Sequence, residues 1–225
     1  MRYLTYLNSG CKDICDNMLI SAEKVGIKKN QFIIVAFDKP IYEYYVNKEY
    51  ECELFHDVPK EEYHNWTWDE NSYFRALVKN KWQLIKKYHK NNKSLMWLDT
   101  DVVFLKNPEP YFNQITKPSF QIDYPVQCAC TGLMYFPDSP ISDEILDILG
   151  SQNTEDDQLI CNDLLKSDKM QGKVNYLNLD FFPNGGYFYD AKRTTTEKAI
   201  MLHCNYIVGL ENKINRLKQT GVWFI

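Results

Sequence analysis

Two aspartates separated by one threonine, Asp99 and Asp101, are the residues of this chain best suited to bind a metal ion. In an extended segment, residues two apart project toward the same face, so both carboxylates would point the same way. Paired carboxylate oxygens suit a divalent cation such as Mn²⁺ or Mg²⁺. Because a diphosphate leaving group needs such a cation to neutralise its growing charge, we expect the pair to bind a metal and a nucleotide diphosphate.

The residues on either side of this triplet strengthen the interpretation. Leu95–Leu98 precedes it and Val102–Leu105 follows it, and both segments are apolar. An Asp-x-Asp pair alone is weak evidence, because such pairs are frequent in acidic loops. Carboxylates between two buried segments, however, need a cationic partner or a metal. The flanking segments therefore favour a metal site over a solvated loop.

His203, at the end of the apolar run 199–202, is the second candidate metal ligand. A lone histidine in this position is more often a hydrogen-bonded core residue. The residues after it favour a metal ligand over a core residue, because Gly209 opens a predicted helix that carries Lys213. A helix N-terminus with a lysine nearby is a favourable site for a diphosphate. We therefore expect His203 to bind the metal and the following helix to bind the diphosphate.

Alternating strands and helices must position these residues. Apolar runs predict strands at 3–7, 32–37, near 52–55 and at 95–98, with helices between them, the longest over about 72–90. Such alternation predicts a parallel sheet with right-handed crossovers. Ligands bind beyond the carboxyl ends of the strands in such sheets, and the triplet follows a strand.

The second half of the chain is more mixed. A strand is predicted at 131–136, helices at 142–149 and 157–165, and a sharp turn at 184–186. The expected fold is therefore a single α/β domain over residues 1–225, Rossmann-like, with a mostly parallel central sheet. Residues 1–105 form the predicted nucleotide-binding half, and residues 106–225 form an α+β half on the acceptor side.

Composition excludes several other classes of protein. With 225 residues, 44% of them hydrophobic and 25% charged, the chain suits one globular domain. The net charge of −4 argues against a nucleic-acid partner. Without a signal peptide or a membrane-length apolar stretch, we expect a cytoplasmic protein whose seven cysteines are free thiols. The apolar end at Val222–Ile225 suggests a domain cut from a longer chain, with further domains C-terminal to it.

Several blocks of residues occur in a characteristic order along nearly the whole chain. They are Thr5, Asn8, Asp13, Asn17, Gly26 and Asp38; Leu77–Val78, Lys81 and Leu84–Ile85; Trp97–Leu105 and Pro108; Thr131–Tyr135; Asp157–Gln158; and His203, Gly209, Lys213 and Trp223. This order resembles the nucleotide-diphospho-sugar glycosyltransferases of the GT-A fold, whose compact members occur in large DNA viruses of algae. The gap between His203 and Gly209 is longer than is common in that family.

The resemblance implies a role for each matched residue. The metal would be held by Asp99, Asp101 and His203, and the nucleotide and its diphosphate by Thr5, Tyr6, Asn8, Asp38, Lys81, Asp99, Gly209 and Lys213. Thr131, Gly132 and Asp157 would contact the donor sugar, and Asp157 and Gln158 would be the catalytic pair facing the sugar and the incoming hydroxyl. Whether Asp156 or Asp157 faces the site stays open.

The implied reaction moves a hexosyl, pentosyl or deoxyhexosyl group from a UDP-sugar to a hydroxyl of a glycan or glycoprotein. It would depend on Mn²⁺ or Mg²⁺, and the resemblance favours retention of the anomeric configuration. A viral member of the family would act in the cytoplasm of its host.

Two other functions remain open from the residues alone. Asp99, Asp101 and Val103 also fit the first motif of haloacid-dehalogenase phosphatases, in which Asp99 would be the nucleophile. That motif normally follows the first strand, whereas here it lies in mid-chain. A sugar-binding module without turnover is the second alternative. Trp66 and Trp68 could form an acceptor platform in either a transferase or such a module, although ordinary packing explains them equally well.

Overall fold

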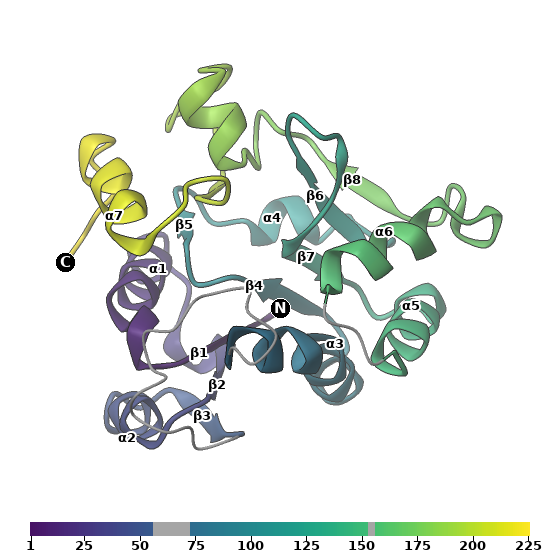
Figure 1. Ribbon diagram of the computed structural model, residues 1–225, viewed down its shortest axis with the longest axis horizontal. Coiled ribbons are helices and arrows are strands. Elements are labelled where there is room, and N and C mark those ends of the chain that lie inside the picture. The colour runs from purple at the N-terminus through teal and green to yellow at the C-terminus, as the bar shows by residue number, and fades with distance from the viewer. Residues whose placement is uncertain (56–72, 153–155) are drawn as a thin grey trace.

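A seven-stranded sheet runs through the centre of the computed structural model, which describes residues 1–55, 73–152 and 156–225 (Figure 1). From one edge to the other, the strands are β3 (Glu51–Leu54), β2 (Phe32–Ala36), β1 (Arg2–Leu7), β4 (Leu95–Leu98), β7 (Cys128–Phe136), β6 (Ser119–Asp123) and β8 (Asn175–Leu177). Trp66 and Trp68 lie outside the described residues.

The first half of the chain forms the parallel part of the sheet. Strands β3, β2, β1 and β4 run parallel to one another, as their alternation with helices predicts. Strand β7 is antiparallel to both β4 and β6, while β8 is again parallel to β6. The prediction of a mostly parallel α/β sheet is confirmed, and the sheet continues without a break into the second half of the chain.

Helices cover both faces of this sheet (Figure 1). They are α1 (Lys12–Lys24), α2 (Lys39–Asn47), α3 (Tyr73–Asn92), α4 (Glu109–Phe112), α5 (Pro140–Gly150), α6 (Asp157–Lys166) and α7 (Leu210–Gln219). Three begin at a polar N-cap whose side chain accepts a backbone N–H, namely Asp38 for α2, Ser139 for α5 and Asp156 for α6. A five-residue π-helix occupies Gly186–Asp190, where the sequence predicts a sharp turn around residues 184–186.

Each face of the sheet packs into its own apolar core. On one face, residues of α1 such as Cys15 and Met18 pack with Phe104 and with Leu217 of α7. On the other face, Trp82 of α3 and Leu146 of α5 pack with Trp97. Burial on both faces explains why strands such as β2 are apolar throughout rather than alternating.

A second sheet of two strands lies outside the main one and brings distant residues together. Strand β5 (Val102–Phe104) pairs antiparallel with β9 (Met201–His203), with Val102 opposite His203. The amide of Phe104 also donates to the Ser21 hydroxyl of α1, at 2.9 Å. This pairing places His203 beside the aspartate triplet although a hundred residues separate them in sequence.

The apolar C-terminal residues pack on helix α1. The Asn17 side chain donates to the carbonyl oxygen of Val222 at 3.1 Å and accepts from the amide of Phe224 at 2.7 Å. Val222 is buried, which accounts for its apolar character. Further C-terminal domains stay a prediction. Among the described residues, no helix combines the length and the apolar character needed to cross a membrane.

Candidate metal centre and adjoining cavity

The triplet lies in a tight turn at the carboxyl end of β4. The amide of Val102 donates to the Asp99 carbonyl oxygen at 3.3 Å, and the Asp99 amide donates to the Gly132 carbonyl oxygen of β7 at 2.7 Å. The prediction of an extended segment was therefore wrong at these three residues. The chain turns here because β4 belongs to the main sheet whereas β5 pairs with β9.

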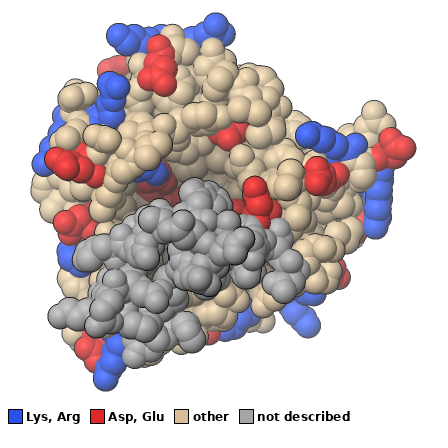
Figure 2. All heavy atoms as spheres, viewed as in Figure 1, with Lys and Arg blue, Asp and Glu red and all other residues tan. Residues whose placement is uncertain are grey.

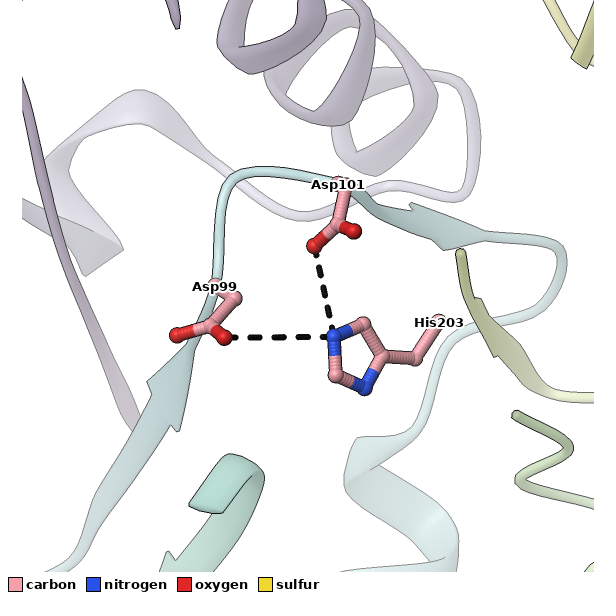
Figure 3. A group of neighbouring side chains, drawn as sticks. All are labelled: Asp99, Asp101 and His203. Carbon is pink, nitrogen blue, oxygen red and sulfur yellow. Dashed lines mark ion pairs between the residues drawn. The ribbon is translucent and has the colours of Figure 1, made fainter. Parts of the chain in front are cut away.

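The turn directs both carboxylates at the imidazole of His203 (Figure 3). Nε2 of His203 lies 3.3 Å from Oδ1 of Asp101 and 3.9 Å from Oδ2 of Asp99. One ligand atom from each of the three residues lies within 4.8 Å of the others. Asp101 and His203 are buried, whereas Asp99 is about one-third exposed. Two carboxylates and one imidazole in this arrangement fit a divalent cation with room for further ligands.

Gln121 of strand β6 fixes the orientation of the imidazole. Its side-chain oxygen lies 2.7 Å from Nδ1 of His203, and its amide nitrogen donates to the Phe182 carbonyl oxygen at 3.0 Å. A carbonyl oxygen can only accept, so Nδ1 carries a proton and Nε2 is the ring nitrogen that faces the carboxylates. Metal-binding histidines typically have such a partner. Burial would lower the pKa of His203, but the Asp101 carboxylate raises it well above its usual value, so without a metal Nε2 is protonated as well. Sequence analysis missed Gln121, whose only signal was a glutamine between apolar residues.

Replacing Gln121 is expected to weaken metal binding without removing any ligand. Gln121→Leu should lower the affinity for Mn²⁺ about ten- to a hundredfold, because the imidazole loses the partner that fixes its tautomer. Gln121→Glu keeps an acceptor in the same place and should retain binding. Calorimetric titration with Mn²⁺ checks both variants, and equal affinity for wild type and Gln121→Leu would contradict the assignment.

Lys213, in the first turn of α7, adds a positive charge to the site. Its Nζ lies 2.5 Å from Oδ2 of Asp101. Burial by itself would raise the pKa of Asp101, but Lys213 and His203 together hold that pKa well below its usual value. Asp101 is therefore an anion, as a metal ligand must be. The preceding Gly209 adopts a left-handed conformation, with φ of 88°, at the start of α7.

These residues lie along one cavity of about 630 Å³, on the face that Figure 2 shows hollowed near its centre. The predicted site residues that line it are Tyr6, Lys81, Asp99, Asp101, Thr131, Gly132, Asp157, Gln158, His203, Gly209 and Lys213. The cavity therefore joins the predicted metal, diphosphate and sugar contacts into one continuous site.

Three predicted nucleotide contacts are not part of the cavity lining. Thr5 is fully buried in β1. The Asn8 side chain accepts from the amide of Gly10, and Asp38 accepts from Ser9 and caps helix α2. These hydrogen bonds account for the polar side chains of Asn8 and Asp38 by local structure alone, whereas the buried Thr5 hydroxyl has no hydrogen-bond partner among the described residues. Their contact with a nucleotide stays a prediction.

Lys81 of helix α3 connects the metal centre to the catalytic candidates. Its Nζ lies 2.7 Å from Oδ2 of Asp157 and 3.6 Å from Oδ1 of Asp99. The Thr131 hydroxyl donates to the same oxygen of Asp157 at 2.6 Å. Asp156 also lines the cavity, but it is exposed and caps α6 through the amide of Leu159. Of the two neighbouring aspartates, Asp157 is thus the one bonded to Lys81 and Thr131 inside the site.

Gly132 has no space for a side chain. A Cβ at this position would lie 2.2 Å from Cε1 of His203 and 2.7 Å from Oδ2 of Asp99. Strand β7 therefore passes directly beneath the candidate metal ligands, and only glycine allows that approach.

Known proteins resemble this chain in both sequence and fold. The family model for nucleotide-diphospho-sugar transferases matches residues 28–217. A UDP-galactose:fucoside alpha-3-galactosyltransferase of Dictyostelium discoideum is 26% identical, over 97% of this chain and 42% of its own length. The chain thus spans less than half the length of that relative.

Two solved structures show the same fold. An active-site mutant of LgtC aligns with a TM-score of 0.57 and 13% identity, over 98% of this chain and 95% of its own. A glycosyltransferase involved in glycosylating the major capsid of PBCV-1 aligns with a TM-score of 0.56 and 12% identity, over 96% of this chain and 100% of its own. These alignments confirm the GT-A-like α/β fold.

Proposed function

Because the chain belongs to the nucleotide-diphospho-sugar transferase family, we propose that it transfers a glycosyl group from a uridine diphosphate sugar to an acceptor hydroxyl. The observation that carries the proposal is the convergence of Asp99, Asp101 and His203 on one wall of a cavity. Family membership also argues against a phosphatase, because the matched region includes all three residues.

Asp99, Asp101 and His203 would hold one divalent cation, with Mn²⁺ favoured because the ligands mix carboxylate and imidazole. When bound, the cation stabilises negative charge on the departing nucleoside diphosphate. Asp101 stays anionic, and Gln121 takes the hydrogen bond from Nδ1 of His203, so Nε2 is the nitrogen that would bind the cation in place of its proton. Asp99 is the most exposed of the three residues and lines the cavity, so the diphosphate would approach the cation from its side.

Lys213, which lies beside Asp101, would also bind the diphosphate. Charge-assisted contacts contribute about 1.5–3 kcal/mol, so Lys213→Ala should weaken UDP binding about ten- to a hundredfold and slow transfer with it. Lys218→Ala, on an exposed part of the same helix, is the matched control. Calorimetric titration of UDP in Mn²⁺ measures both variants, and unchanged affinity in Lys213→Ala would overturn this role.

At the other end of the cavity, Asp157 and Gln158 would face the donor sugar. Lys81 and Thr131 hold the Asp157 carboxylate, and Gln158 is fixed by its bond to Asp123 at 3.1 Å. An inverting transfer needs a carboxylate base behind the sugar. Asp157 is engaged by a lysine and a hydroxyl, so we propose that it positions the sugar instead of acting as that base, in agreement with the retention that the family resemblance implies. The anomeric proton coupling of the product, measured by NMR, tests this directly.

A screen of nucleotide sugars tests the proposed donor. UDP-galactose is the first candidate, because the Dictyostelium relative is named for that donor and for a fucoside acceptor. In the presence of Mn²⁺, we expect UDP-sugars to raise the melting temperature of the protein. We also expect the protein to hydrolyse them slowly and so release UDP. An equal response to guanosine diphosphate sugars would contradict the uridine assignment.

A further inference from the structure

Tyr206 is an aromatic residue that lines the cavity, and its backbone conformation is unusual for a bulky residue. It lies between the ligand His203 and helix α7, with φ of 66°. Its exposed fraction is 47%, so about half of the residue is accessible to solvent. A bulky residue seldom adopts a positive φ unless its surroundings impose it, and such residues cluster at binding sites.

The residue before Tyr206 is anchored on several sides. Nδ2 of Asn205 donates to Oδ1 of Asp123 at 2.8 Å, and Oδ1 of Asn205 accepts from the amide of Gly185 at 3.1 Å. The backbone carbonyl oxygen of Asn205 lies so close to Gly185 that a Cβ there would be 2.1 Å away. On the other side, Ile207 packs against the apolar core. The position of Tyr206 is therefore imposed by both neighbours.

Asp123 connects the segment that carries Tyr206 to the end of the cavity where Asp157 and Gln158 lie. One oxygen of its carboxylate accepts from Asn205 and Asn184, and the other accepts from Gln158. Burial and the nearby Asp123 carboxylate raise the pKa of Tyr206, with smaller contributions from Cys128 and Cys130. Asp123, Gln158 and Tyr206 all line the same cavity.

A half-exposed phenol ring in this place has the chemistry of a sugar platform. A sugar ring has one face rich in C–H groups, which packs against an aromatic ring, while its hydroxyls point to polar neighbours. Tyr206 supplies the ring, and Asp123 and Gln158 supply polar groups in the lining of the same cavity. Gln158 already lies where the donor sugar is proposed, so the space next to Tyr206 is left for the second sugar.

We propose that Tyr206 is the platform on which the sugar ring of the acceptor stacks. The inference rests on the proposed glycosyl transfer. It assigns acceptor selection to the segment between His203 and Gly209, and it predicts that acceptors need an apolar ring face beside the hydroxyl that receives the sugar.

Two substitutions separate the aromatic ring from the backbone. Tyr206→Asn removes the ring but keeps a residue that tolerates the left-handed conformation, and Tyr206→Phe keeps the ring. Tyr176→Asn is the matched control, because Tyr176 is 50% exposed on strand β8 and does not line the cavity. The probes are methyl fucoside, methyl galactoside and methyl glucoside, assayed for transfer with UDP-galactose and Mn²⁺. Their binding, in UDP and Mn²⁺, is measured by saturation-transfer NMR.

Tyr206→Asn should raise the KM for the best methyl glycoside about tenfold and remove its saturation-transfer signal, while UDP affinity changes less than about twofold. Tyr206→Phe and Tyr176→Asn should match wild type. If Tyr206→Asn leaves the acceptor KM and the NMR signal unchanged, the inference is wrong. It is also wrong if the variant loses affinity for UDP and not for the acceptor. Failure of wild type to transfer or hydrolyse any UDP-sugar would instead contradict the proposed function itself.

Discussion

Asp101→Asn is expected to lower the rate of glycosyl transfer at least a hundredfold, measured as initial rates at saturating UDP-sugar and Mn²⁺. Asparagine keeps the shape of the side chain but removes the negative charge that faces both His203 and Lys213. A metal ion contributes several kcal/mol of charge stabilisation, and each 1.36 kcal/mol changes a rate about tenfold. Loss of one anionic ligand should therefore cost about two powers of ten or more.

Asp16→Asn provides the control for this substitution. Asp16 is also a buried aspartate with lysine neighbours, Lys12 and Lys48, but it does not line the cavity. This variant should keep its activity. If Asp101→Asn is as active as Asp16→Asn, Asp101 is not a ligand. If circular dichroism shows that only Asp101→Asn is unfolded, the triplet is structural rather than catalytic.

Gly132→Ala should abolish Mn²⁺ binding and transfer while leaving most of the fold intact. The added methyl group would lie 2.2 Å from His203 and 2.7 Å from the Asp99 carboxylate, and real Cβ atoms do not approach that closely. Because both neighbours are candidate ligands, relief of the clash must move at least one of them. A displacement of about 1 Å at a reacting site can cost about a hundredfold in rate.

Gly150→Ala is the matched glycine control. It lies at the end of α5, and its added Cβ would meet the flexible Lys86 side chain at 3.0 Å and the Trp82 carbonyl oxygen at 3.6 Å, which is an ordinary contact distance. Its activity should equal that of wild type. Calorimetric titration with Mn²⁺ and initial rates measure both variants, and normal Mn²⁺ affinity in Gly132→Ala would contradict the ligand geometry.

The sequence was most informative where function depends on residues close together in the chain. Asp99 and Asp101 are recognisable because two apolar segments flank them, and the segment from Gly209 to Lys213 is recognisable as the start of a helix. The parallel strands of the first half were also predictable, because each is a continuous apolar run followed by a helical pattern.

Contacts between distant segments could not be predicted in the same way. Gln121 reaches His203 across 82 positions, and Asn205 reaches Asp123 across the same separation. Both contacts depend on the pairing of β6 with β7 and of β5 with β9. Strands β5, β6 and β9 have only three to five residues, which is too short for a clear alternation of apolar and polar residues. The conformation of Tyr206 is set by these contacts, so no local pattern of residues predicts it.

The central claim is metal-dependent sugar transfer from a uridine nucleotide, and mass spectrometry of one reaction tests it most directly. The wild-type chain is incubated with UDP-galactose, Mn²⁺ and methyl fucoside, with and without excess chelator. The predicted result is a product heavier than the acceptor by one hexose, with release of UDP, both stopped by chelator and restored by Mn²⁺. Undiminished transfer in chelator, or release of inorganic phosphate with a phosphorylated Asp99, would contradict it.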